Sequence, residues 1–258
     1  MLRDRAWSTV RLAVILTVVI VPSAYSQTDP PLDGRVISES GQPIEGVSVT
    51  GSRSKTCCPF KSDSTYTDAT GAFHLEHPGA VVHFFDKAHE PQILIVKPEV
   101  AKVEITLASP SNDLVMPNCT KPDRSQREIG WGKYGLHFFV PRKGMNVSGG
   151  KSDADYTVFF VRSRTSPVQL QLWFGAYAMG LDPEDEVLIN SATFSQKRIL
   201  NAEGELVGTD SRGQLQDGMT WRQTAAGFQG AKYRAARRDD AELFDRIIGS
   251  VCWIPYRE

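Results

Sequence analysis

Apolar and polar residues alternate along the first third of the chain, in short runs separated by Gly, Pro and Asp. Val47 and Val49 are two residues apart, and Phe73 and Leu75 flank His74. Successive side chains of a β-strand point to opposite faces, so this period of two separates an inner face from an outer one. Further strands are predicted at residues 35–37, 81–85, 92–96 and 103–107, with a hairpin turn at 68–71. The pattern predicts an all-β sandwich domain at residues 33–107.

The second half of the chain combines longer strand patterns with two helical ones. Asp182-Pro-Glu-Asp-Glu is typical of a helix start, because proline fits the first turn and carboxylates face the positive end of the helix dipole. That helix is expected to run to about Ala192. Asp239 or Asp240 is expected to cap a final helix, whose apolar residues recur at three- and four-residue spacing. These apolar residues are Leu243, Phe244, Ile247, Ile248 and Val251.

The strand patterns of this half complete the expected architecture. They fall at residues 134–140, 156–162, 168–174, 197–200, 206–216, 219–224 and 232–236. Residues 128–258 are therefore predicted to form an α+β domain, an antiparallel sheet covered by the C-terminal helix. The segment 109–127 is rich in Pro, Ser, Asn and Asp and is predicted to be a linker.

Three motifs in the first domain carry a family resemblance. They are Gly34-Arg-Val, Gly41-Gln-Pro-Ile-Glu-Gly-Val-Ser-Val and Thr67-Asp-Ala-Thr-Gly-Ala-Phe. Residues 33–107 thereby resemble the carboxypeptidase regulatory-like family, although the third motif has one extra residue and Ala88-His89 replaces the usual Gly-Tyr. The resemblance implies a transthyretin-like or immunoglobulin-like sandwich that serves as a non-catalytic accessory module. Trp221-Arg-Gln, Tyr233-Arg and the final helix give residues 128–258 a similarity to exported domains of the PsbP-like type.

The N-terminus has the three parts of a secretory signal. Basic residues at positions 3, 5 and 11 precede an apolar run at 12–21. The small-residue segment Ala24-Tyr25-Ser26 follows this run. The apolar run is shorter than the roughly 20 residues that a spanning helix needs. We therefore expect a signal peptide at residues 1–26, cleaved near Ser26, and a secreted or periplasmic protein without a transmembrane anchor.

The charge of the chain argues against a nucleic-acid partner. Its 29 basic and 30 acidic residues give a formal net charge of −1, and no long basic block stands out. The expected partner is instead a protein or a small ligand, and no cofactor is expected.

Four cysteines lie in what is expected to be an oxidising compartment: Cys57, Cys58, Cys119 and Cys252. They allow three connectivities, among which the sequence does not choose. We favour a disulfide between Cys119 and Cys252, which leaves Cys57 and Cys58 as a vicinal pair or as thiols.

Histidines offer the main candidates for metal chemistry. Four of the five fall between positions 74 and 89, and histidine is a common metal ligand. His74, Glu76 and His83 are the candidate ligands of a metal site. The alternative is that these histidines are scattered over the surface and the strand edges, and we favour this alternative.

Other catalytic patterns are weak. The chain has no Gly-x-Ser-x-Gly nucleophile motif, and a thiol mechanism through Cys252 and His137 conflicts with the disulfide. Aromatic residues gather in the second half, and four are candidates for a binding surface: Trp131, Trp173, Tyr177 and Trp221. The sequence thus favours an exported, non-enzymatic binding or scaffolding protein. The alternative is a metal- or thiol-dependent enzyme that uses the His74–His89 cluster or Cys252.

Overall fold

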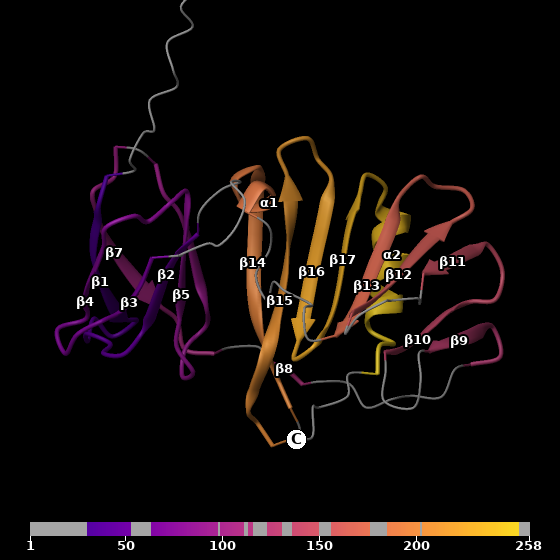
Figure 1. Ribbon diagram of the computed structural model, residues 1–258, viewed down its shortest axis with the longest axis horizontal. Helices are drawn as coiled ribbons and strands as arrows, with labels where there is room; N and C mark the ends of the chain where they lie inside the picture. Colours follow the sequence, from indigo (N-terminus) through magenta and orange to yellow (C-terminus); the bar gives the residue numbers. More distant parts are fainter. Residues whose placement is uncertain are drawn as a thin grey trace, which may run out of the picture.

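The computed structural model describes residues 30–52, 63–97, 99–110, 113–115, 123–130, 136–149, 156–175, 185–201 and 203–252. Within these ranges the protein is mainly β, with several antiparallel sheets and a helix near the C-terminus (Figure 1). The β-rich fold expected from the alternating pattern is thus confirmed. The predicted signal peptide, Cys57, Cys58, Cys119, Trp131 and Tyr177 lie outside the described residues.

Seven strands of the N-terminal unit form two sheets around a shared core. They are β1 (Leu32–Ser38), β2 (Ser48–Ser52), β3 (Ser64–Tyr66), β4 (Ala72–Leu75), β5 (Val81–Phe85), β6 (Gln92–Ile95) and β7 (Lys102–Leu107). One sheet has the order β4-β1-β7 and the other the order β3-β2-β5-β6. Val36 and Phe73 of the first sheet and Val49 and Phe84 of the second belong to the same buried cluster. The period of two is confirmed on β4, where Phe73 and Leu75 are buried and His74 is exposed.

The turn at residues 68–71 forms where it was predicted, but it does not close a hairpin. The Asp68 carboxylate accepts hydrogen bonds from the N–H groups of Thr70 and Ala72, and Gly71 has a positive φ of 75°. However, β3 pairs with β2, whereas β4 pairs with β1. The hairpin prediction is therefore wrong, because turn residues specify a local reversal of the chain but not the partner of the strand that follows.

The C-terminal half contains an eight-stranded sheet with the order β11-β12-β13-β17-β16-β15-β14-β8. Its strands are β8 (Leu114–Val115), β11 (Met145–Gly149), β12 (Tyr156–Ser163), β13 (Gln169–Gly175), β14 (Ser191–Leu200), β15 (Leu206–Leu215), β16 (Thr220–Ala226) and β17 (Gln229–Ala235). A separate pair joins β9 (Gln126–Gly130) to β10 (His137–Pro141). The segment predicted to be a linker supplies β8, which pairs in parallel with β14 at the sheet edge.

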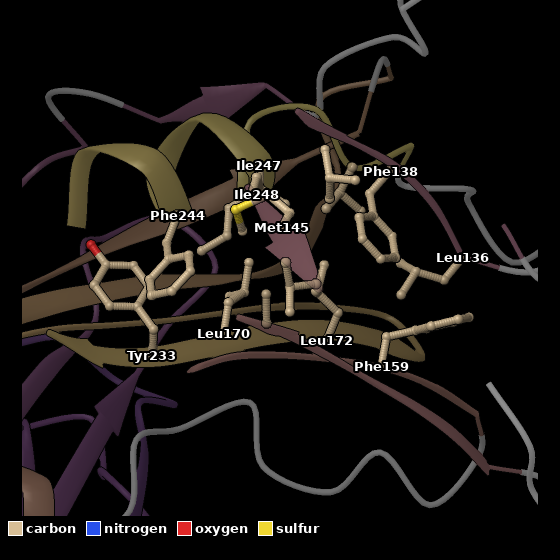
Figure 2. Close-up of a cluster of buried hydrophobic side chains, with 14 of the residues drawn as sticks. Leu136, Phe138, Met145, Phe159, Leu170, Leu172, Tyr233, Phe244, Ile247 and Ile248 are labelled. Carbon is tan, nitrogen blue, oxygen red and sulfur yellow. The ribbon is translucent and has the colours of Figure 1, made fainter. Parts of the chain in front are cut away.

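Helix α2 (Arg238–Ile248) packs on one face of this sheet through the predicted apolar stripe. Phe244, Ile247 and Ile248 are buried with Leu170 and Tyr233 of the sheet (Figure 2). The predicted cap is wrong.

The N-cap position of α2 is Arg237, and Asp239 and Asp240 lie in the first turn. Asp240 instead accepts a hydrogen bond of 2.8 Å from the Ser166 hydroxyl, so its carboxylate ties the helix to the loop before β13. Carboxylates in the first turn still interact favourably with the helix dipole.

The other described helix, α1 (Asp185–Ile189), is shorter than the sequence predicted. It ends at Ile189, and Ser191 already begins β14. The reason is that residues 191–200 pair along their length with β15, and this ladder outweighs the local helix signal.

The N-terminal unit contacts the sheet on the side that α2 leaves uncovered. Val81 of β5 is buried with Val187 and Leu188 of α1 and with Leu215 and Trp221 of the sheet. Figure 1 shows β5 and its neighbours beside α1 and β14. The two units therefore share a packed contact in addition to their separate cores.

Candidate ligand-binding site

A row of polar side chains crosses the face of the large sheet opposite α2. Leu170, Leu172 and Tyr233 point to the α2 core, so the residues that alternate with them point to the other face. On this other face, one residue from each of five neighbouring strands lies at a directly paired position. These positions, which we call the polar row, are Gln171, Lys232, Gln223, Ser211 and Gln196.

The polar row is partly buried, which is costly for polar groups unless they are hydrogen-bonded. Ser211 is 0% exposed and Gln223 is 8% exposed. Gln196 Nε2 donates to Ser211 Oγ at 3.0 Å. This hydrogen bond offsets part of the cost of burying the two side chains.

A cavity of about 350 Å³ opens over three members of the polar row, Gln171, Lys232 and Gln223. Its wall includes three glutamines, two cationic side chains, the Trp221 indole and Val187 of α1. The described lining residues are Gln169, Gln171, Val187, Trp221, Arg222, Gln223, Lys232, Tyr233 and Arg234. A volume of this size is at the lower end of the roughly 300–1,000 Å³ range of small-molecule sites.

The lining offers both donors and acceptors of hydrogen bonds. Each glutamine amide has two donor hydrogens and an acceptor oxygen, whereas Lys232 and Arg234 only donate. A smaller cavity of about 240 Å³ adjoins the first, since both are lined by Val187 and Arg234. Its other described lining residues are Glu186, Asn190, Leu215, Gln216, Asp217 and Met219.

A buried ionic network holds the strands of the site from the α2 side. Asp210 of β15 accepts hydrogen bonds from Arg212 at 2.5 Å and from Arg222 at 2.6 Å. Arg222 also donates to Asp245 of α2 at 2.8 Å, and the Tyr233 hydroxyl donates to the same oxygen at 2.9 Å. The network therefore joins β15, β16 and β17 to the helix behind the cavity.

Burial and neighbouring charges shift the pKa values of Tyr233 and Arg222. Burial raises the pKa of the Tyr233 hydroxyl, and the Asp245 carboxylate raises it further. Tyr233 thus remains a donor at neutral pH. Burial works against the charged form of Arg222, but the Asp210 and Asp245 carboxylates outweigh it, and the pKa of Arg222 is raised.

The metal-site candidates lie in different sheets. His74 Nδ1 is 2.8 Å from Asp33 and Nε2 is 3.1 Å from Glu76, on the exposed face of the β4-β1-β7 sheet. The hydrogen bond with Asp33, and then that with Glu76, raises the pKa of His74. His83 is on β5 of the other sheet. Within the described residues, no group of three or more His, Cys, Asp or Glu side chains is arranged to hold a metal ion.

Cys252 is disulfide-bonded. Its N–H donates to the carbonyl of His137 at 2.8 Å, which joins the end of the chain to β10. The other cysteines lie outside the described residues, so the pairing with Cys119 stays a prediction. A disulfide sulfur has no thiolate, and Cys252 in this state is not a nucleophile.

Two of the four candidate aromatic residues lie on the cavity face of the sheet. Trp221 lines the cavity, is 2% exposed and donates from Nε1 to the Ser191 hydroxyl at 2.9 Å. Trp173 is buried with its indole against Gly230. Neither indole presents an open stacking surface, so Trp221 contributes an apolar wall to the cavity.

Sequence reasoning missed the glutamines and cations of the site. Their signal is the alternation in Gln169-Leu-Gln-Leu and Lys232-Tyr-Arg, where every second residue is polar or cationic, together with Gln223 in the run Trp221-Arg-Gln. Each run alone is typical of a strand with one solvent-exposed face. Only the register between strands brings the three runs together.

No protein-family model matches this chain, and no curated protein sequence is significantly similar to it.

Proposed function

We propose that the protein is an exported, non-enzymatic binding protein that holds a small polar ligand in the cavity over the polar row. The observation that carries the proposal is one wall of the cavity, where the partly buried side chains of Gln171, Gln223 and Lys232 lie at paired positions of three strands. Such a lining recognises a ligand by hydrogen bonds, and the ionic network behind it keeps the strands in place.

In this proposal the N-terminal unit is an accessory β-sandwich module. The two sheets that share one core, and the motifs between Gly34 and Phe73, support a sandwich of the carboxypeptidase regulatory-like type. Its contact with α1 and Trp221 supports a role in bracing the wall of the cavity.

The features of the leader support export to the periplasm or the medium, with cleavage near Ser26. Among the described residues, none of the helices has the length and apolar character needed to cross a bilayer.

Ligand-dependent thermal stabilisation tests the proposal. Residues 27–258 are screened against a panel of small polar metabolites, which includes neutral, anionic and cationic compounds. A ligand present at 100 times its Kd stabilises the native state by about 2.7 kcal/mol, which is a readily measured rise in Tm. We expect at least one member of the panel to stabilise the protein.

Two matched variants locate the binding. Gln171→Ala removes an amide from the polar row, whereas Gln214→Ala removes one from an exposed position of β15. The stabilisation is expected to fall in the first variant and to remain in the second. A panel without any stabilising compound, or an equal loss in both variants, would contradict the proposal.

A further inference from the structure

We propose that three neighbouring chain segments at one end of the protein form a docking surface for the anionic phospholipids of a membrane. The segments are residues 123–125, 142–144 and 164–167, which we call the basic end. None of these residues is among the described lining residues of the cavity, so the proposal does not depend on the proposed function.

Backbone hydrogen bonds place the three segments side by side. The N–H of Arg142 donates to the carbonyl of Ser125, and the N–H of Arg164 donates to the carbonyl of Gly144, both at 2.9 Å. The middle segment therefore lies between the other two. Figure 1 shows the neighbouring strands β9, β10 and β11 at the end of the molecule farthest from the N-terminal unit. The basic end is thus one continuous surface that a flat partner can reach.

Positive charge is concentrated on this surface. Its four cationic side chains, Arg124, Arg142, Lys143 and Arg164, are all exposed. The three segments contain one acidic residue, Asp123, although the whole chain has a formal net charge of −1. A local excess of one sign of charge steers a protein toward a partner of the opposite sign and orients it there.

The neighbouring polar groups leave this charge available to a partner. The Asp123 carboxylate accepts from the N–H and the hydroxyl of Ser125, and these hydrogen bonds lower the pKa of Asp123. Arg164 donates from Nε to the Asn146 amide oxygen at 3.4 Å, which is a neutral acceptor. Within the described ranges, the ion pairs of the protein do not include any of the four cations.

Arg127 adds a cation behind the surface. It lies on β9 opposite Val140, close to the 123–125 segment. Its Nε is buried and has no hydrogen-bond partner among the described residues. Salt screens a partly buried charge less than an exposed one, so Arg127 contributes to the positive potential of the basic end.

The composition of the three segments favours a membrane surface over a nucleic-acid strand. They contain no aromatic residue, whereas proteins that bind single-stranded nucleic acids stack the bases on aromatic side chains. They also lack the large apolar side chains that insert into a bilayer. The contact is therefore electrostatic and confined to the headgroups, whose phosphates arginine binds through two parallel hydrogen bonds.

Cosedimentation with vesicles tests the proposal. Residues 27–258 are used, because the apolar run at 12–21 would itself bind lipid. One vesicle population is pure phosphatidylcholine, and the other contains about 30 mol% phosphatidylglycerol. We expect the protein to bind the anionic vesicles at least about tenfold more tightly than the neutral ones at low salt, and to be released by about 0.5 M NaCl.

Charge variants locate the contact. The triple variant Arg142→Gln, Lys143→Gln, Arg164→Gln is expected to lower the partition coefficient about 100-fold, because each cation near an anionic surface contributes about fivefold. The variant Arg142→Lys, Arg164→Lys keeps the charge and is expected to bind within about twofold of the parent. The control Lys87→Gln, Lys97→Gln, Lys102→Gln removes three exposed cations of the N-terminal unit and is expected to bind like the parent. The Tm of each variant shows whether it is folded.

Each other outcome would overturn the proposal. Equal binding to both vesicle populations would show that the contact is not electrostatic, and no binding to either would show that the surface has another role. Equal losses in the triple variant and its control would place the contact elsewhere. Dextran sulfate is included as a soluble polyanion, and tight binding to it without binding to anionic vesicles would assign the basic end to a polyanionic chain instead.

Discussion

At the scale of single residues, Asp210 combines deep burial with two ionic partners. The residue is 1% exposed and its carboxylate accepts from both Arg212 and Arg222. A carboxylate is buried at low cost only while its charge is compensated. Its removal would leave Arg222, itself mostly buried, paired with Asp245 of α2 but without the Asp210 carboxylate.

We predict that Asp210→Asn lowers the free energy of unfolding by about 2–4 kcal/mol, because a buried ion pair is broken on one side only. Urea denaturation of the variant and the parent protein measures the difference. Asp239→Asn, at an exposed position of the first turn of α2, is the matched control and is expected to change stability by less than about 0.5 kcal/mol. Equal effects of the two substitutions would show that the network carries little stability.

The stability of the folded state is expected to depend on pH through His74. Its hydrogen bonds with Asp33 and Glu76 raise its pKa above the ordinary value of 6.5. The interaction stabilises the folded state below pH 6.5 and is lost as the pH rises through the higher pKa of the folded protein. An NMR titration is expected to place the His74 pKa above 6.5, and Asp33→Asn to lower it. A His74 pKa that Asp33→Asn leaves unchanged would rule out this cause.

At the scale of elements, the sequence predicts the strands and helices that show a regular spacing of apolar residues. The strand expected at 81–85 is observed with the same bounds as β5, and the apolar stripe of α2 is buried as expected. Elements that depend on a partner were less well predicted. The strand β14 extends to Ser191 because β15 pairs with it, although the local pattern predicted a helix to Ala192.

The candidate site shows the same limit. Gln171, Gln223 and Lys232 are visible in the sequence as polar residues of separate strands, but their alignment across the sheet depends on two strand registers. Neither register follows from the alternation, since every shift by two residues preserves it. Trp221 was predicted as a candidate binding residue, and it lines the cavity.

The contact between α2 and the sheet makes a prediction at this scale. Phe244 is fully buried, and its ring lies 5.4 Å from that of Tyr233. Phe244→Ala is expected to cost about 3–5 kcal/mol, since it removes a large apolar side chain and leaves a cavity. Glu242→Ala on the exposed side of α2 serves as the control. Chemical denaturation monitored by circular dichroism measures both, and a loss below about 1 kcal/mol for Phe244→Ala would contradict the packing described.

At the scale of the whole molecule, Arg198 links three parts of the chain. This buried residue of β14 donates to both carboxylate oxygens of Asp113, at 2.9 and 2.5 Å, and to the carbonyl of Lys87 in the N-terminal unit. The hydrogen bonds from Arg198 lower the pKa of Asp113. Residues that are far apart in sequence make this link, so local patterns do not predict it.

We predict that Arg198→Ala loosens the N-terminal unit from the sheet, because Asp113 and the Lys87 carbonyl lose their shared donor. The expected result is faster cleavage by trypsin between residues 109 and 127 and a separation of the thermal transitions of the two units. Lys197→Ala is the control, since Lys197 is the sequence neighbour and points to the opposite face of β14. The same loosening is expected in acid, because the link is stable at high pH and is lost as the pH falls through the lowered pKa of Asp113.

The short parallel pairing of β8 with β14 has a practical consequence for work on isolated halves. A fragment that begins at residue 128 lacks both β8 and Asp113. Its β14 would then present a bare ladder edge and a buried arginine without its carboxylate. Unpaired edges of this kind recruit other strands, so such a fragment is expected to self-associate in solution. Cutting after Ser109 instead keeps the edge strand with the sheet that needs it.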